Sequence, residues 1–350
     1  MIIYFILLAF TMLLLFIPSD KSRTNNSRIY LVSIILILFA GLRNQTVGTD
    51  SGNYVYFFER EVGNYFSSLN LETGFLTLET LAATISTSYW SLFTLIAIVS
   101  VMSYVYSIKK LSQNISLSFF IYITLAAYIF FFNGARQGLA ASIFTIALVF
   151  LIKRKFLWFL IWVCVASLFH RTVLIMLPFY YILQFKYSTF RMVLFAVLSF
   201  VGLTFLSFFL SFLDEGQGDK YSAYVDRGAS GGSLLGLFFF FIAIVLIYFR
   251  KIIPIQAQKT YDIYLNLCVF NALIYVVVIA IGVDVNFLRF SQYFLVGYVM
   301  IWPIIFKYAP IAKYSLFKVA FYMLHLGFYA IYLLKMSDMI PFVFNTELFI

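Results

Sequence analysis

The chain has 350 residues, of which 63% are hydrophobic, 21% aromatic and only 11% charged, with a mean hydropathy of +0.98. A water-soluble globular domain does not reach these values, because so much apolar surface would aggregate in water. The net charge of +10 is spread over short segments between apolar runs, so it indicates membrane topology and does not indicate a nucleic-acid partner.

Apolar runs recur along the whole chain, and about 20 apolar residues cross the hydrocarbon core of a membrane as a helix. The first run, MIIYFILLAFTMLLLFI, has no basic region before it and no small-residue cleavage site after it, which indicates a retained helix and not a signal peptide. The pattern predicts an all-α polytopic transmembrane bundle of about 12 spans, a single integral membrane domain over residues 1–350. The predicted spans are 1–17, 29–42, 90–107, 117–132, 134–152, 156–169, 172–185, 192–213, 234–249, 261–282, 287–306 and 315–334.

One further run, GFLTLETLAATISTS at 74–88, is too polar for a span and carries Glu79 in its middle. Counting it as a span would move the basic segment 153–155 to the outer side, against the preference of lysine and arginine for cytoplasmic loops. We therefore expect a re-entrant or interfacial segment. The resulting topology places both termini outside, with 16 of the 24 basic residues inside and 12 of the 14 acidic residues outside. Its two larger outer loops are 43–73 and 214–233.

The outer basic residues are mostly arginines, and arginine presents a planar fork of donors that matches phosphate in a bidentate way. Their positions near predicted helix ends indicate a site for an anionic headgroup. The candidates for binding a diphosphate are Arg136 and Arg289, with Arg43, Arg171 and Arg227 as further candidates.

In FFNGARQGLAAS, Asn133 and Gly134 interrupt the apolar run and are suited to cap the next helix. Arg136 and Gln137 then fall in the first turn, where backbone N–H groups and the helix dipole favour an anion. The alternative is a hairpin whose arginine only reaches toward the membrane surface.

In ASLFHRTVLIMLP, His170 and Arg171 form a polar pair between two apolar runs. Polar groups at such a position are costly, which makes a functional role the first hypothesis, and a neutral imidazole accepts a proton from a sugar hydroxyl. The alternative is an interfacial histidine with a structural hydrogen bond.

Two other outer segments carry candidate residues. In GVDVNFLRFSQYF, Asp284 and Arg289 flank a predicted hairpin and either pair with each other or contact a ligand. In DEGQGDKYSAYVDRGASGG, Tyr224 and Arg227 are available to a ligand, and the tyrosine ring is suited to stack on a sugar.

The segment TVGTDSGNYVYFF at 46–58 has more chemistry than a connecting loop needs. Gly48 and Gly52 allow a tight turn that delivers the Asp50 carboxylate to a fixed place, with Tyr54 facing sugar. Asp50 and His170 are the two candidates for the catalytic base. The alternative for Asp50 is a cap on a helix that begins at Asn53.

No motif requires a metal or another cofactor, since the sequence has no paired-histidine zinc pattern and no clear Asp-x-Asp. The two cysteines, Cys164 and Cys268, lie inside apolar runs and are interpreted as packing residues.

The segment GLRNQTVGTDSGNYVYFF resembles the signature of the EpsG-type branch of Wzy-like bacterial polysaccharide polymerases. NGARQGLAASIF, SLFHRTVLIMLP and SDMIPFVFNTELF resemble later marks of that family, in the same order along the chain. The last one departs from the family at Phe342, where the family often has tyrosine, so no hydroxyl is offered there.

The resemblance implies a membrane glycosyltransferase that builds O-antigen, capsule or exopolysaccharide at the outer face of the bacterial cytoplasmic membrane. Its substrate would be an undecaprenyl-diphosphate-linked oligosaccharide, with the growing chain transferred to the next repeat, and a chain-length regulator protein is an expected partner. Two alternatives remain: an O-antigen ligase, and a transporter or flippase of the same lipid-linked sugar.

Overall fold

The structure is a computed structural model that describes residues 1–16, 22–60, 72–198, 200–201, 230–281 and 285–345. Throughout this part of the chain the regular structure is helical, apart from one isolated antiparallel bridge between Arg43 and Phe344. The predicted all-α class is confirmed. The chain divides into two compact units: unit 1 is Met1–Tyr180 with Pro310–Ile350, and unit 2 is Tyr181–Ala309. The prediction of a single domain is not tested by this division.

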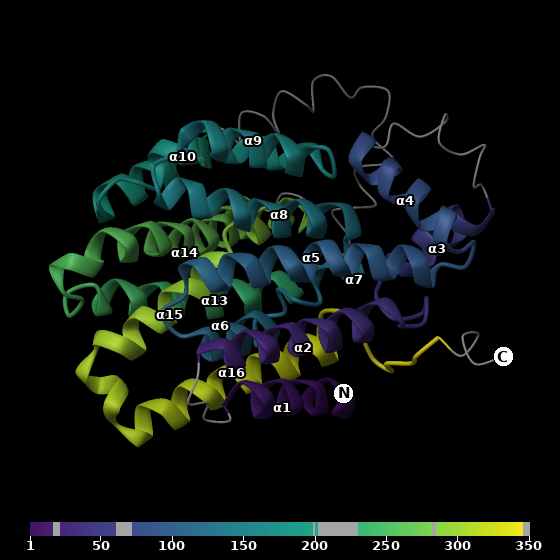
Figure 1. Cartoon of the computed structure of the whole chain (residues 1–350). Coiled ribbons are helices and arrows are strands. Elements are labelled where there is room, and N and C mark those ends of the chain that lie inside the picture. Colours follow the sequence, from purple (N-terminus) through teal and green to yellow (C-terminus); the bar gives the residue numbers. More distant parts are fainter. Residues whose placement is uncertain (17–21, 61–71, 199, 202–229, 282–284, 346–350) are drawn as a thin grey trace. The chain divides into compact units, whose positions relative to one another are not determined.

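Unit 1 contains most of the helices labelled in Figure 1. They are α1 (Ile2–Phe16), α2 (Ser22–Gly41), α3 (Ser51–Arg60), α4 (Thr73–Ile85), α5 (Trp90–Leu111), α6 (Ile115–Thr124), α7 (Phe130–Asn133), α8 (Ala135–Ile152), α9 (Phe156–Ser167), the 3-10 helices η2 (Arg171–Met176) and η4 (Pro310–Lys313), and α16 (Ser315–Lys335). The short α10 (Phe179–Ile182) lies at the boundary.

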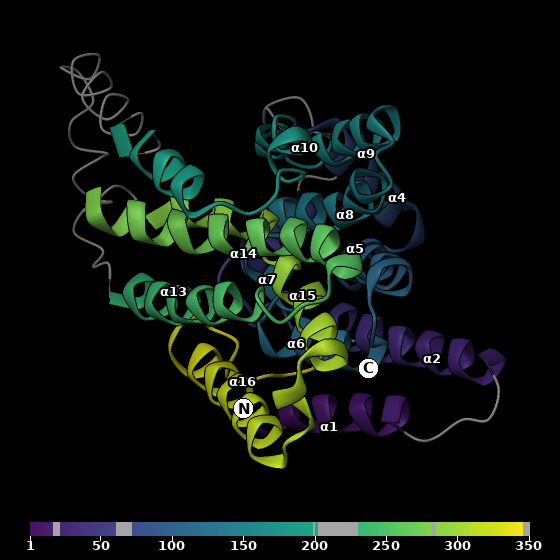
Figure 2. The same cartoon turned by 90° about the vertical axis from the view of Figure 1, so that its left-hand side faces the viewer.

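Unit 2 contains α13 (Ser230–Phe249), α14 (Ile255–Ile281), the 3-10 helix η3 (Val285–Tyr293) and α15 (Val296–Tyr308). A helix at Thr189–Leu198 also belongs to it. Figure 2 shows α13 beside α14. On α15, a Cβ added to Gly297 would lie 2.9 Å from the Tyr264 carbonyl oxygen, so the small residue allows α15 to approach α14 closely. The two helices joined by 250–254 are also tied by Arg250, which donates to both Asp262 oxygens at 2.6 and 3.0 Å.

Five described helices are long and apolar enough to cross a membrane, namely α5, α8, α14, α16 and the part of α13 at Gly232–Phe249. A sixth span results if Phe287–Tyr293 and Val296–Tyr308, bent by 43°, form one span. Shorter apolar helices are α1, α4, α6, α9, Asn26–Gly41 and Thr189–Leu198. The chain is therefore a polytopic helical membrane protein, while the count of about 12 spans stays a prediction.

Besides the bend between Phe287–Tyr293 and Val296–Tyr308, the structure differs from the predicted spans in two places because the backbone leaves the α-helical form. The predicted span 117–132 is divided into α6 and α7 by a turn in which Ala126 has φ +61°. The predicted span 172–185 consists of η2 and α10. Most of the predicted span 192–213 and the loop 214–233 up to residue 229 lie outside the described residues.

The core of unit 1 is formed by neighbouring apolar helices, with α5 packed on α2 and α8, and α8 packed on α9 (Figure 1). Gly41 at the end of α2 lies against Thr94 of α5, where a side chain would meet the Thr94 backbone. Inside the core, the Ser107 and Thr145 hydroxyls share a hydrogen bond of 2.8 Å that joins α5 to α8. Small residues and buried hydroxyl pairs of this kind allow helices to associate where no water is present.

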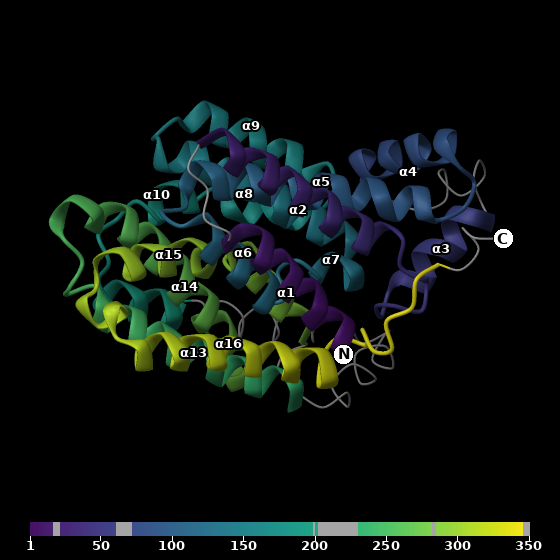
Figure 3. The ribbon, with the colours of Figure 1, turned by 60° about the horizontal axis from the view of Figure 1, so that its bottom comes forward.

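Several connections meet at one end of unit 1, which we call the loop end: residues 42–50, the start of α5, residues 133–134, His170 and residues 337–345. Gly48 lies against the carbonyl of Phe132, and Asn44 N–H donates to the Val343 carbonyl at 2.8 Å. The Tyr4 hydroxyl donates to the Met339 carbonyl at 2.9 Å, so the beginning of α1 lies beside the segment that follows α16 (Figure 3). The two terminal segments thus lie at the same end, as the predicted topology requires.

Helix α4 has both of its ends at the loop end. Gly74 N–H donates to the Leu168 carbonyl at 2.8 Å, and just after α4 the Tyr89 N–H donates to Glu59 at the end of α3, at 3.0 Å. The segment 74–88 therefore returns to the end from which it starts, in agreement with the prediction that it is not a span.

The opposite end of unit 1 carries the basic segment 153–155, which is predicted to be cytoplasmic. There the Lys109 ammonium lies 4.8 Å from the centre of the Tyr30 ring, and the Ser116 hydroxyl donates to the Leu15 carbonyl at 3.1 Å. Lys153, Arg154 and Lys155 form the short turn between α8 and α9.

Candidate functional site

The centre of the candidate site is Glu72, which directly precedes α4 as its N-cap residue. Its Oε2 accepts a hydrogen bond from Arg136 Nη1 at 2.8 Å. Its Oε1 lies 3.2 Å from His170 Nδ1 and 3.4 Å from the backbone nitrogen of Arg171. One carboxylate thus joins the first turn of α8 to the start of η2, across 64 and 98 positions of sequence.

The burial of these three side chains is unequal. Glu72 is 9% exposed, whereas Arg136 is 33% and His170 is 24% exposed. Glu72 is therefore the most buried of the three side chains, and the arginine and histidine are only partly buried. Arg136 and His170 therefore offer more accessible surface to a ligand than Glu72 does.

The electrostatics keep Glu72 ionised. Burial by itself raises the pKa of the Glu72 carboxyl, but a backbone N–H group, Arg136 and His170 together lower this pKa below its ordinary value. A carboxylate only accepts hydrogen bonds, so His170 Nδ1 carries the proton that points to Oε1. The other ring nitrogen, Nε2, is then the one suited to accept a proton.

Tyr54 and Asp50, both in the segment 46–58, belong to the same charged neighbourhood. Burial raises the pKa of Tyr54, the Arg136 guanidinium lowers it, and the Asp50 carboxylate raises it again, with a net increase. Tyr54 therefore remains a neutral phenol. Its ring packs against Phe75 of α4 at 5.7 Å between centroids. Asp50 directly precedes Ser51, where α3 begins, and its carbonyl accepts from Tyr54 N–H at 3.3 Å, so the helix begins two residues before the predicted Asn53.

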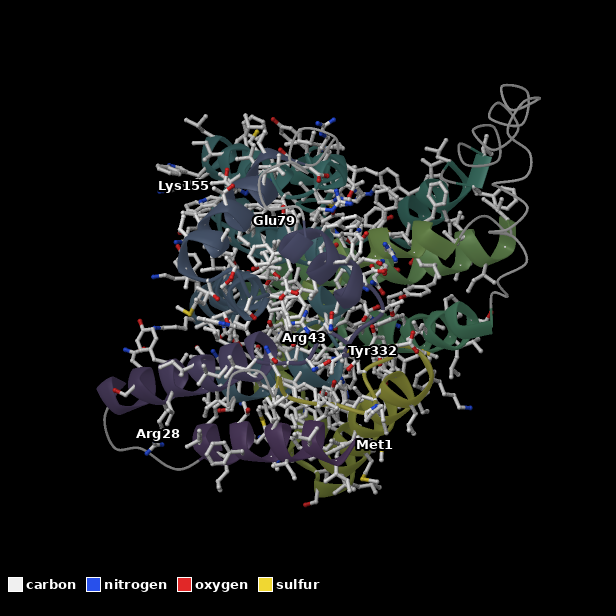
Figure 4. The ribbon with its side chains drawn as sticks, turned by 90° about the vertical axis from the view of Figure 1, so that its right-hand side faces the viewer. Met1, Arg28, Arg43, Glu79, Lys155 and Tyr332 are labelled. Carbon is white, nitrogen blue, oxygen red and sulfur yellow. The ribbon has the colours of Figure 1, made fainter. Side chains whose placement is uncertain are left out.

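Glu79 lies within α4, and its carboxyl is a second acidic group whose pKa is influenced by Arg136. It lies seven residues after Glu72, close to two helical turns, and is 5% exposed (Figure 4). Burial raises the pKa of Glu79 to about 7, and Arg136 opposes this increase. The N-cap acid of α4 and an acid within α4 are thus both influenced by Arg136, but Glu72 is ionised near neutral pH whereas Glu79 has a pKa of about 7.

The loop before α3 is fixed by its neighbours at the loop end. Gly48 has φ +102°, and its N–H donates to the Asp338 carbonyl at 3.1 Å. Asn133 uses its side chain for this loop: Oδ1 accepts from Thr49 N–H at 2.9 Å, and Nδ2 donates to the Ser337 carbonyl at 3.0 Å. The residue predicted to cap α8 therefore bridges two loops, and Gly134 occupies the N-cap position without a side-chain bond.

Arg43 lies in the interior of unit 1 (Figure 4) and is 1% exposed. Its guanidinium carbon lies 3.9 Å from the centre of the Phe93 ring and 4.2 Å from that of Phe132. Its nitrogens donate to the Ala40 carbonyl at 2.5 Å and to the Ser51 hydroxyl at 3.4 Å. This enclosure favours a role in packing the loop over the predicted role in binding a diphosphate.

The remaining predicted site residues have different placements. Gln137 lies in the first turn of α8, as predicted, and is 6% exposed. The Arg171 side chain is exposed, and the residue contributes its backbone N–H to Glu72. Arg289 is exposed on η3 in unit 2. Tyr224, Arg227 and Asp284 lie outside the described residues.

In the part of the chain that the structure describes, no three histidine, cysteine, aspartate or glutamate side chains are grouped so that they could hold a metal ion. The cluster around Glu72 offers instead a guanidinium for an anion, an imidazole and carboxyls for proton transfer, and a phenol for hydrogen bonding.

A family model described as the EpsG family matches residues 27–344, which is most of the chain. The chain belongs to the EpsG family. No curated protein and no solved structure matches it. The EpsG family consists of membrane proteins linked to exopolysaccharide biosynthesis.

Sequence reasoning on this EpsG protein did not identify Glu72 as a site residue. The available signal was the pair of acids, Glu72 and Glu79, spaced to share one face of a helix in an otherwise apolar segment. An acid in such a segment is expected to pair with a cationic side chain, but sequence spacing does not identify which arginine is the partner.

Proposed function

We propose that this EpsG-family protein is a polysaccharide polymerase, a glycosyltransferase that joins lipid-diphosphate-linked repeat units. The observation that carries the proposal is the arrangement of Arg136 and His170 around Glu72 at the loop end. It combines an accessible guanidinium for a diphosphate with a group that accepts a proton, which are the two requirements of glycosyl transfer from a diphosphate.

In the proposed reaction, a hydroxyl oxygen of the incoming repeat attacks the anomeric carbon of the growing chain. The bond from this carbon to the diphosphate oxygen breaks, and its electron pair leaves with undecaprenyl diphosphate. The hydroxyl proton passes to His170 Nε2 or to Asp50. Arg136 stabilises the charge that develops on the leaving diphosphate, a task for which the guanidinium fork is well suited.

The other candidates have supporting roles in this proposal. Tyr54 beside Arg136 contacts sugar, and the exposed Arg171 assists with the diphosphate. Gln137, which is 6% exposed, remains a candidate from the sequence. Arg289, Arg227, Tyr224 and Asp284 remain candidates from the sequence. Arg43 is assigned to packing, because its enclosure between two aromatic rings keeps it from ligands.

We further propose that the loop end faces the exterior of the bacterial cytoplasmic membrane, where the lipid-linked repeats are polymerised. The opposite end carries Lys109, Lys110, Lys153, Arg154 and Lys155, which favours the cytoplasm for that end. A chain-length regulator is the proposed protein partner.

The gathering of the charged cluster at one end of unit 1 favours an enzyme over a flippase. A flippase needs polar groups along a path that opens to both faces of the membrane. An O-antigen ligase would use the same diphosphate chemistry with a different acceptor, so this alternative is separated by its product.

The test is mass analysis of the lipid-linked glycan in cells that lack the gene. Loss of a polymerase leaves single repeats on the lipid diphosphate at the outer leaflet. Unattached polymer would identify a ligase, and repeats trapped on the cytoplasmic leaflet would identify a flippase. Return of polymer with the native gene, and not with the Arg136→Gln variant, links the activity to the site.

A further inference from the structure

Glu72 is held by two different groups through its two oxygens. Arg136 Nη1 donates to Oε2 at 2.8 Å, while Oε1 faces both His170 Nδ1 and the Arg171 N–H. The proposed reaction uses Arg136 and His170 for different steps. Glu72 connects them through a single carboxylate.

The pairing with Glu72 means that Arg136 already has an anionic partner before any diphosphate arrives. Arg136 is the more exposed member, and Oε1 of Glu72 contacts His170 Nδ1 and the Arg171 N–H. A diphosphate approaching from the accessible side therefore competes with Oε2 for the guanidinium. Displacement of Oε2 does not release the carboxylate, because its Oε1 contacts remain.

We propose that Glu72 is a positioning residue that exchanges with the diphosphate on Arg136 and thereby couples binding of the diphosphate to proton transfer at His170. This inference rests on the proposed function. In the unliganded site the charge of Glu72 is shared by Arg136 and His170. When the diphosphate takes Arg136, the Glu72 carboxylate keeps its contacts with the imidazole and with the Arg171 N–H, and its charge acts more strongly on the imidazole.

The consequence for the reaction follows from charge pairing. An imidazole becomes a better proton acceptor when a neighbouring carboxylate stabilises its charged form. The His170 imidazole would thus be a stronger base when the diphosphate is bound and a weaker base when the site is empty. Glu72 moves no atoms of the substrate, and in this arrangement the acceptor-hydroxyl proton goes to His170 Nε2, one of the two acceptors in the proposed reaction.

The exchange predicts opposite effects of a Glu72→Gln variant on pyrophosphate affinity and on polymer formation. The neutral amide no longer competes for Arg136, so we expect inorganic pyrophosphate to bind the purified full-length protein about 5-fold more tightly than it binds the native protein, a modest relief of ion-pair competition. The same variant should make at least about 10-fold less polymer in cells, because the histidine has lost its orienting charge. A residue with a merely structural role would not raise affinity while lowering turnover.

The measurement is calorimetric titration of pyrophosphate into the protein in lipid nanodiscs, with polymer quantified in a strain that lacks the native gene. Glu59→Gln is the matched control, since Glu59 lies at the exposed end of α3 and accepts the Tyr89 N–H. It should leave both pyrophosphate affinity and polymer unchanged. If Glu72→Gln does not fold, Glu72→Asp shortens the reach to Arg136 and should also bind pyrophosphate more tightly.

Two outcomes separate this inference from the proposed function. Unchanged or weaker pyrophosphate binding in the Glu72 variant, with Arg136→Gln abolishing binding, would overturn the exchange and leave the diphosphate site in place. Native pyrophosphate binding in Arg136→Gln would instead overturn the assignment of the diphosphate to Arg136, on which the proposed function depends.

Discussion

The backbone N–H of Gly48 donates to the carbonyl of Asp338 at 3.1 Å, which joins the loop before α3 to the segment after α16. Gly48 adopts φ +102°, and a Cβ at this position would lie 2.7 Å from the Phe132 carbonyl oxygen. The left-handed backbone and the close approach both require glycine. The loop that carries Asp50 is therefore positioned from the far end of the sequence.

This relationship predicts that Gly48→Ala destabilises the protein by about 1–3 kcal/mol, through backbone strain and the clash with Phe132. Thermal unfolding of the purified protein measures the effect. Gly52→Ala is the control, because a Cβ there has no neighbour within 4 Å and α3 is already helical at that position. Equal melting temperatures for the two variants would contradict the role assigned to Gly48.

Changing Arg136 to lysine should lower polymer formation at least about 10-fold while the protein still inserts and folds. Lysine keeps the charge but loses the planar fork that engages Glu72 and the diphosphate. Polymer analysis in the deletion strain, together with membrane-fraction immunoblots, measures both. Arg154→Lys, at the opposite end of unit 1, should behave as the native protein. Full polymer formation by Arg136→Lys would reduce Arg136 to a residue that only reaches toward the membrane surface.

Asp50 and His170 are distinguished by neutral substitutions of similar size. If Asp50 is the base, Asp50→Asn should abolish polymer and leave the melting temperature near the native value, because asparagine still serves as a helix cap at a cost of some tenths of a kcal/mol. His170→Gln is compared with it in the same assay. Polymer of normal amount and length in Asp50→Asn would assign the loop a structural role and pass the base to His170.

Glu79 should make stability depend on pH. The pKa of Glu79 in the folded protein is about 7, above the ordinary value of 4.5. The contribution of Glu79 to the free energy of unfolding is therefore complete below pH 4.5 and is lost as the pH rises toward and through 7. The loss is on the order of 3 kcal/mol. Melting temperatures measured at pH 5 and pH 8 should therefore fall with pH, and fall less in Glu79→Gln, which does not titrate. An identical fall in both proteins would assign the pH dependence to other groups.

Cysteine labelling tests the orientation of unit 1. In a Cys164→Ser background, Asn53→Cys at the loop end should react with an impermeant reagent added outside intact cells. Arg154→Cys at the opposite end should react only after the membrane is opened. The reverse pattern would place every proposed site residue on the cytoplasmic side and overturn the site.

Local sequence determined those features that depend on neighbouring residues. The apolar runs identified the membrane helices α5, α8 and α16, since burial in lipid requires long apolar segments. The break at Asn133 and Gly134 correctly placed Arg136 and Gln137 in the first turn of α8. The lengths of the spans were predicted less accurately, because interruptions such as the turn at Ala126 depend on packing as well as on composition.

The tertiary structure decided which charges meet. The sequence predicted that Arg43, Arg136 and Arg171 all lie on the outer side and are candidates for binding a diphosphate. In the structure Arg43 is enclosed by Phe93 and Phe132, whereas Arg136 is paired with an acid 64 positions away. Sequence spacing does not determine such contacts. The energy of a charge depends on its burial and on the nearest opposite charge, and both are set only when distant helices pack together.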